Sequence, residues 1–228
     1  MSTETGSRAP AALARQRRRS EVVADVWVHA LGIGGSLIGF LVLVVLAARQ
    51  NSIFSTVSLI LYGAALIGTM SCSALYNGRH GSPRRELYRR IDHAAIFVMI
   101  AGTYTPFLAV KIGGVWGLSL LAYVWLIAGA GVLVKLVHPH TLERFSTILY
   151  LFLGWTILAV PGPLFSSVSL PAIILLAAGG VLYSVGVLFH LWDRLAYSQA
   201  IWHLFVVIAA GCHYVAVLGD VALPGVFA

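Results

Sequence analysis

The sequence predicts an all-α fold: a multi-pass membrane protein built as a seven-transmembrane helix bundle, with a cytosolic N-terminus and an external C-terminus. Three observations support this prediction. Of the 228 residues, 59% are hydrophobic and only 10% are charged, whereas a soluble domain carries roughly 25% charged residues. The apolar residues form runs long enough to cross a membrane, and the basic residues gather in alternate gaps between those runs.

Each apolar run approaches the roughly 20 residues that a spanning helix needs. The first run exceeds the roughly 7–15 apolar residues of a secretory signal, so we interpret it as a retained span. Prolines make the boundary between the fifth and sixth runs the least defined. Residues 1–20 are expected to form a disordered, basic cytosolic tail, and 21–228 a single transmembrane domain. The seven runs cover residues 24–48, 53–77, 91–110, 115–137, 145–164, 169–191 and 199–219.

Basic residues mark one side of the membrane. On the other side only Arg49 and Lys111 fall near the gaps. Since cytoplasmic segments carry the excess of lysine and arginine, this asymmetry places the N-terminus in the cytosol, and the cell membrane is the expected location. The basic residues on the cytosolic side are Arg8, Arg15, Arg17, Arg18, Arg19, Arg79, Arg84, Arg85, Arg89, Arg90, Lys135, Arg144 and Arg194.

The same pattern excludes several classes of function. The net charge of +7 is spread over the gaps and forms no soluble basic face, so no nucleic-acid partner is expected. Cys72 and Cys212 each lie alone in an apolar run, which excludes a cysteine-rich metal motif. A retinal-type photoreceptor needs a lysine in the core of its last helix, and the last lysine is Lys135. Membrane lipids are the expected partners, and neither a monomer nor a homo-oligomer is predicted.

Polar side chains cluster at the cytosolic ends of several predicted spans. Charged groups inside a membrane are costly and usually mark function, although some have simpler interpretations. Asp92 can pair with Arg89 or Arg90 at the membrane edge, and His93 can face headgroups. Asp25 and His29 are spaced four residues apart, which is typical of a local pair at the interface. The residues of this polar cluster are Asp25, His29, Ser73, Asn77, Asp92, His93, His190, Gln199 and His203.

Three stretches together resemble the hemolysin III family, the bacterial branch of the progestin and adipoQ receptors. They are "SALYN" at 73–77, "RIDHAAIFVMIAGTYTPF" at 90–107 and "AIWHLFVVIAAGCHYVAV" at 200–217. The resemblance covers nearly the whole chain. It implies seven helices and a zinc ion near the cytosolic side, held by three histidines, with an aspartate that holds a zinc-bound water. A site of this type underlies the proposal that relatives hydrolyse lipid amides such as ceramides.

The chain departs from that motif at two of the three histidine positions. Ser73, Asp92 and His203 match it, but Asn77 and Gln199 stand where the family has histidine. Carboxamide oxygens suit hard cations better than zinc. His203 and Asp92 are then the remaining metal ligands, too few for tight binding, and zinc is expected to be absent. A site rewired through His80 or His93 is an alternative.

We therefore predict a polar pocket of Ser73, Asn77, Asp92, Gln199 and His203 that joins three helices by hydrogen bonds in place of a metal. The predicted function is a role in membrane-lipid homeostasis, as a sensor, a regulator or a lipid-modifying protein. If the chain is an enzyme, Asp92 and His203 are its expected catalytic residues, as base and orienting partner. The alternatives are a pore-forming or transport protein, and a zinc-dependent lipid amide hydrolase with a rewired site.

Overall fold

The computed structural model describes residues 18–79, 81–138, 143–192 and 194–227. All regular structure in these ranges is helical. Eight α-helices are joined or extended by three short helical segments, two of them π-helical and one 3-10. The elements are α1 (Arg19–Ala47), α2 (Ile53–Gly78), α3 (Arg85–Pro106), η1 (Phe107–Ile112), α4 (Gly114–Val137), α5 (Glu143–Gly154), η2 (Thr156–Ala159), α6 (Pro161–Ser167), α7 (Leu170–His190), α8 (Ser198–Val217) and η3 (Leu218–Ala222).

Six helices are long and apolar enough to cross a membrane, which confirms the predicted integral membrane protein. They are α1, α2, α3 with η1, α4, α7, and α8 with η3. Most bounds agree with the apolar runs, although α3 begins at Arg85, six residues before the predicted 91–110. Of the predicted tail at 1–20, residues 1–17 lie outside the described ranges, and Arg19 and Ser20 already belong to α1.

The fifth predicted span, 145–164, is not one continuous helix. It is divided into α5, η2 and the start of α6, with Trp155 and Val160 between them. Pro161 and Pro163 open α6, where their missing N–H groups need no helical partner. At the break, the Tyr104 hydroxyl lies 2.7 Å from the carbonyl oxygen of Gly154 and accepts a hydrogen bond from the amide of Ile157 (3.0 Å). A side chain of α3 therefore satisfies backbone groups that the interrupted helix leaves unpaired.

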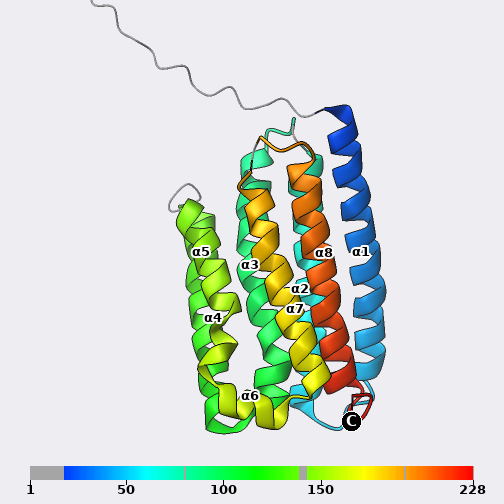
Figure 1. Ribbon diagram of the computed structural model, residues 1–228, viewed down its shortest axis with the longest axis vertical. Helices are drawn as coiled ribbons and strands as arrows, with labels where there is room; N and C mark the ends of the chain where they lie inside the picture. Colours follow the sequence, from blue (N-terminus) through cyan, green and yellow to red (C-terminus); the bar gives the residue numbers. More distant parts are fainter. Residues whose placement is uncertain (1–17, 80, 139–142, 193, 228) are drawn as a thin grey trace, which may run out of the picture.

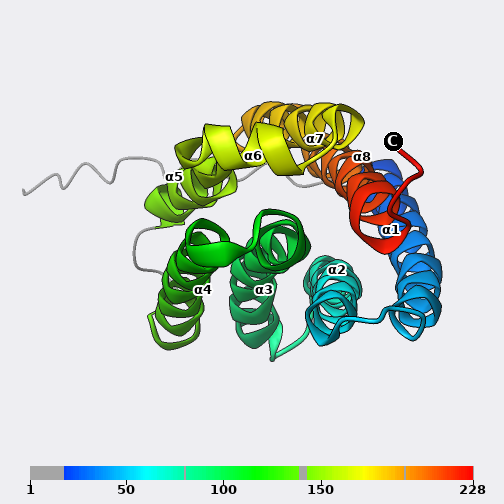
Figure 2. The ribbon, with the colours of Figure 1, turned by 90° about the horizontal axis from the view of Figure 1, so that it is seen from below.

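The helices form a closed bundle (Figures 1 and 2). Seen along the bundle axis in Figure 2, α1 to α4 follow one another along one arc, while α5, α7 and α8 make the other. The two arcs meet where α8 packs on α1. Figure 1 shows α6 lying across the lower end, where η3 also ends, whereas α1 and α8 begin at the upper end. We call these the C-terminal end and the N-terminal end of the bundle.

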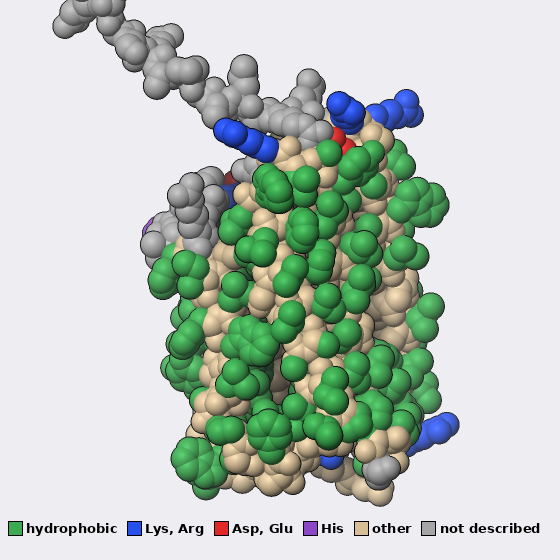
Figure 3. Space-filling model, viewed as in Figure 1, with side chains coloured by type: hydrophobic (Ala, Val, Ile, Leu, Met, Phe, Trp, Pro, Cys, Tyr) green, Lys and Arg blue, Asp and Glu red, His purple; other side chains and the backbone are tan. Residues whose placement is uncertain are grey.

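The outward surface suits a lipid environment. Hydrophobic side chains cover the face drawn in Figure 3, and its basic side chains stand at the two ends. Large apolar residues such as Ile38, Leu126 and Leu188 are about two-thirds exposed, which would be unfavourable in water but not in lipid. The interior is filled by residues such as Leu59 and Phe97, both at least 99% buried.

Candidate functional site

The N-terminal halves of α1 and α8 pack closely because small residues line the buried side of α1. Asp25, Gly32 and Gly39 recur every seven residues and are buried. At Gly32 and Gly39, an added Cβ would come within about 3.0 Å of the side chains of Val207 and Tyr214, both on α8. The two backbones can therefore approach each other, as small residues allow between membrane helices. This stripe turns Asp25 toward α8.

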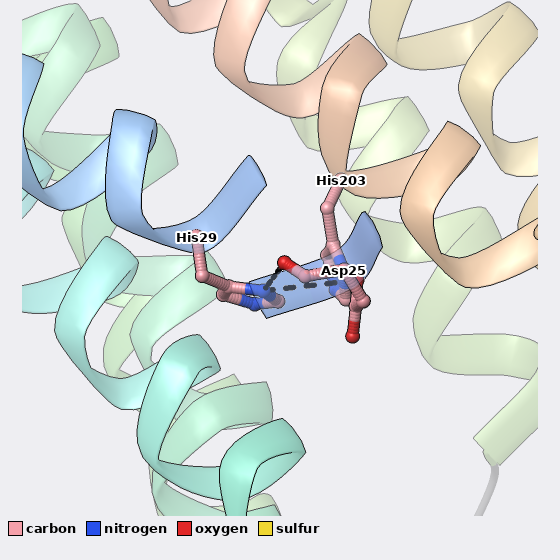
Figure 4. A group of neighbouring side chains, drawn as sticks. All are labelled: Asp25, His29 and His203. Carbon is pink, nitrogen blue, oxygen red and sulfur yellow. Dashed lines mark hydrogen bonds and ion pairs between the residues drawn. The ribbon is translucent and has the colours of Figure 1, made fainter. Parts of the chain in front are cut away.

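Asp25, His29 and His203 meet at this contact (Figure 4). Nδ1 of His203 lies 2.6 Å from Oδ1 of Asp25, and the two imidazole rings are 4.3 Å apart between centroids. Asp25 is 4% exposed and His203 is 7% exposed. Asp25 and His29 do interact locally, with 3.7 Å between Oδ1 and Nδ1. The pair is not isolated, however, because the α1 stripe also brings both residues into contact with His203 on α8.

Hydrogen bonds fix how each imidazole is presented. Nδ1 of His29 lies 2.8 Å from the backbone carbonyl oxygen of Asp25, which can only accept, so this nitrogen carries the proton. Nε2 of His29 is then the acceptor, and it faces the Ser73 hydroxyl at 3.2 Å. An ionised Asp25 likewise keeps the proton of His203 on Nδ1. Nε2 of His203 thus has a lone pair that is available to a ligand, whereas Nε2 of His29 would become available when the Ser73 hydroxyl turns away.

The predicted pocket residues take different places around this cluster. Ser73 contacts His29, and its hydroxyl also interacts with the Asp92 carboxyl, which is buried. Asn77 donates to the backbone carbonyl of Ser73 within its own helix, at 3.0 Å. Gln199 is partly buried in the first turn of α8 and makes no hydrogen bond to another described residue. The structure therefore brings Ser73, Asp92 and His203 together with α1, and leaves both carboxamides outside these contacts.

The remaining histidines and arginines near this end lie apart from the cluster. Arg89 and Arg90 both contact Glu86 on α3, one turn earlier, at 3.0 and 3.3 Å. His93 stacks edge-on against Tyr76, with 6.4 Å between ring centroids. His80 lies outside the described residues. None of these contacts offers Asp92 an arginine partner, and Asp92 faces inward toward Ser73.

The cluster has the composition of a metal site. One ligand atom from each of Asp25, His29 and His203 lies within 4.8 Å of the others. Two neutral imidazoles and a carboxylate are donors that zinc prefers, with bonds of about 2.0 Å. The donor set therefore fits zinc by its chemistry, and three protein ligands would leave a fourth position free.

Sequence reasoning identified Asp25 and His29 but did not assign them to this site. The signal was present in the seven-residue recurrence of Asp25, Gly32 and Gly39, because that spacing marks one face of a helix. The sequence did not reveal which residue on another helix contacts Asp25. Asp25 and His203 are separated by 178 positions, and no local pattern connects them.

Comparison with known proteins shows which sequences the chain resembles. Residues 18–214 match the family model described as "Haemolysin-III related". Hemolysin-3 of Bacillus cereus is 35% identical over 186 residues, covering 82% of this chain and 85% of the relative. The hemolysin-3 homolog of Bacillus subtilis (strain 168) is 34% identical over 198 residues, covering 87% and 93%. The human monocyte to macrophage differentiation factor is 26% identical over 203 residues, covering 86% and 83%.

Proposed function

Because the chain belongs to the haemolysin III family, we propose that it is a zinc-dependent lipid hydrolase of the cell membrane, acting in membrane-lipid homeostasis on lipid amides. The observation that carries the proposal is the convergence of His29, His203 and Asp25, from two helices, in the buried N-terminal half of the bundle. In this proposal His29 replaces the imidazoles missing at Asn77 and Gln199. The site is thus rewired through α1, and not through His80 or His93.

Each residue has a defined task in the proposed site. His29 and His203 would offer Nε2 to the metal, and Asp25 would either bind it directly or orient His203 through their 2.6 Å hydrogen bond. A bound zinc ion supplies a Lewis acid and lowers the pKa of water to near 7. Asp92 would receive the proton from the attacking water. Ser73, which lies between His29 and Asp92, would position that water.

The burial of the three donor side chains supports a lipid substrate. The donors belong to α1 and α8, two of the helices that are long and apolar enough to cross a membrane, and in this proposal they lie at the depth of an amide bond just below a lipid headgroup. Water is scarce there, so hydrogen bonds and charges act more strongly than at a surface. The Asp25 carboxylate would partly offset the charge of a divalent ion, which a set of carboxamides would not.

Metal content tests the site without reference to activity. We expect one zinc per chain in protein purified in detergent without chelators, measured by mass spectrometry of the elements. His29→Ala and His203→Ala should each lower this to below about 0.1. His213→Ala is the matched control on α8, since His213 is hydrogen-bonded to the Leu176 carbonyl and packs on the Tyr183 ring, away from the cluster. Asn77→Ala should also keep its zinc. A chain without metal, or a loss shared by His213→Ala, contradicts the proposal.

Activity is tested separately with Asp92→Asn. This variant should keep its zinc and lose hydrolysis of a labelled ceramide by about 100-fold or more, as expected for loss of a general base. If the wild-type chain binds zinc but does not hydrolyse the lipid, the proposed metal site is supported and the proposed hydrolase activity is contradicted. Flux through liposomes tests the predicted alternative of a pore. The Asp25 cluster gives that alternative no support, because it lies at one end of the bundle only (Figure 1).

The topology belongs to the same proposal. We infer seven crossings, the fifth made by α5 and η2, with the N-terminal end of the bundle on the cytosolic side. The placement of the start of α1 and the end of η3 at opposite ends supports an odd number of crossings (Figure 1). Cysteines introduced at Ser20 and Ser166 should be labelled by an impermeant reagent from the cytosolic and external side, respectively.

A further inference from the structure

A second polar site lies at the C-terminal end of the bundle, far from the Asp25 cluster. Nζ of Lys111, on η1, is 3.4 Å from Oδ2 of Asp220, on η3. Oδ1 of Asp220 accepts a hydrogen bond from the backbone amide of Ser169, the N-cap residue of α7, at 3.3 Å. The Asp220 carboxylate therefore joins the ends of α3 and α8 to the start of α7. The proposed hydrolase chemistry uses none of these groups.

These groups line a pocket of about 290 Å³. Its walls combine Lys111 and Asp220 with the serines Ser166, Ser167 and Ser169 and the ring of Phe227. Sites for drug-sized ligands occupy about 300–1,000 Å³, so this volume suits a single headgroup better than a whole lipid. A positively charged side chain surrounded by hydroxyl groups has the composition of a site for an oxyanion.

Both charged residues stand on π-helical turns. Lys111 lies in η1, which extends α3, and Asp220 lies in η3, which extends α8. A π-helical turn holds an extra residue and changes the direction in which the following side chains point, and such turns are frequent at functional sites. Here two independent turns direct opposite charges into one pocket.

The ammonium group of Lys111 has unused hydrogen-bonding capacity. It carries three N–H donors, and within the described residues its sole polar contact is the Asp220 carboxylate. The Lys111 side chain is 25% exposed, whereas that of Asp220 is 4% exposed. A ligand entering the pocket would therefore reach the cation first, with the carboxylate buried behind it. This order of approach favours an anion over a cation.

We propose that this pocket binds the phosphate group of a membrane lipid. The phosphate oxygens would accept hydrogen bonds from the free N–H groups of Lys111 and from the serine hydroxyls. Exposed apolar residues adjoin the lining residues in sequence: Phe165, Leu170 and Val226 are each 63–65% exposed. They provide a surface for the glycerol and acyl parts, which a free phosphate ion lacks. This proposal is independent of the metal site.

Native mass spectrometry of the full chain in detergent tests the proposal with dioleoyl phosphatidylglycerol as the probe. Dioleoylglycerol, which has the same acyl chains and no phosphate, is the comparison lipid. We expect the chain to bind the phospholipid at least about tenfold more tightly than the neutral lipid. This difference corresponds to the free energy of charge-assisted hydrogen bonds to the phosphate group. Equal retention of the two lipids would overturn the proposal.

Matched variants locate the site. Lys111→Gln should weaken phosphatidylglycerol binding by about tenfold or more, and Lys111→Arg should retain it. Arg49→Gln removes the same charge from an exposed position near the same end and should change binding by less than about twofold. Equal losses of phosphatidylglycerol binding in Lys111→Gln and Arg49→Gln would show that basic residues attract anionic lipid in general. That result would contradict the proposed binding pocket.

Two further arms keep the proposal falsifiable if Lys111→Gln folds poorly. Asp220→Asn removes the internal competitor for Lys111, so phosphatidylglycerol binding should strengthen, and unchanged or weaker binding by the folded variant contradicts the proposal. Inorganic phosphate at millimolar concentration should not displace the lipid, since it lacks the apolar contacts. Displacement would assign the pocket to a soluble anion and overturn the lipid assignment.

Discussion

The two ends of the bundle both bring an acid and a basic side chain together inside the protein, but they do so by different means. At the N-terminal end, regular helices α1 and α8 place Asp25, His29 and His203 through helical periodicity and small residues. At the C-terminal end, Lys111 and Asp220 meet because the helices that carry them leave the α-helical geometry in η1 and η3. Side chains make the first site, and backbone irregularity makes the second.

This difference has consequences for how each end responds to substitution. The N-terminal cluster depends on hydrogen bonds between side chains, so single polar substitutions should disrupt it while the helices stay in place. The C-terminal end depends on close backbone packing around η1, so a small steric change should matter more there than the loss of a charge. Four substitutions test this contrast, with unfolding measured by titration of the purified chain with denaturing detergent.

The largest effect is expected from Gly117→Ala at the C-terminal end. The added Cβ would overlap the backbone carbonyl oxygen of Leu108 in η1, which cannot move aside as a flexible side chain can. We expect a loss of about 3 kcal/mol in the free energy of unfolding. Gly129→Ala is the matched control on α4, because its Cβ would meet nothing within 4 Å. Similar losses of stability from both substitutions would show that packing against η1 contributes no more than any other contact of α4.

The second effect is expected from Asp25→Ala at the N-terminal end. Nδ1 of His203 would lose its acceptor inside the membrane, which costs about 2 kcal/mol for a buried unpaired donor. Asp25→Asn retains an acceptor oxygen and should lose less than half as much. If Asp25→Ala proved as stable as the wild-type chain, the hydrogen bond to His203 would contribute nothing to the helix contact.

A smaller effect is expected from Asp220→Asn. The substitution removes the ion pair with Lys111, while the amide oxygen can still accept from Ser169. Since the Lys111 side chain is 25% exposed, solvent screens the pair, and we expect a loss of about 1 kcal/mol or less. The difference from wild type should shrink further in 1 M salt. A loss greater than that of Gly117→Ala would reverse the contrast between the ends.

The smallest effect, of opposite sign, is expected between the two ends. The Tyr62 hydroxyl is fully buried and has no hydrogen-bond partner among the described residues. Tyr62→Phe should therefore raise the free energy of unfolding by up to about 1 kcal/mol. Tyr214→Phe is the control that should lower it, because the Tyr214 hydroxyl donates to the carbonyl of Gly39 at 3.0 Å. Destabilisation by Tyr62→Phe would reveal a partner for this hydroxyl in the membrane-embedded protein.

Local sequence patterns were sufficient to predict most of the helices. The predicted runs 53–77, 115–137 and 169–191 agree with α2, α4 and α7 to within one residue at each end, because length and apolarity are sufficient to specify a helix in lipid. The broken segment of α5 and η2 was not predicted, since the groups that satisfy its backbone belong to Tyr104 on another helix.

The sites were predictable only in part. The motif around Ser73, Asp92 and His203 directed attention to the correct end of the bundle, and these residues do lie near one another through Ser73, His29 and Asp25. The contribution of α1 depends on a contact across the fold, which a family motif confined to other helices does not contain. Lys111 and Asp220 carry no motif at all, and only the folded chain shows that they form a pair.

The hydroxyl of Tyr104 also constrains how the chain is made. A segment with a gap in its backbone hydrogen bonding between Leu153 and Ile157 is poorly suited to enter lipid alone, where each unpaired group costs several kcal/mol. Tyr104 precedes this segment in synthesis, so the third helix is already available when residues 143–159 leave the ribosome. If this segment forms the fifth crossing, as proposed above, its insertion would depend on the first half of the protein, and the order of translation would supply the partner in time.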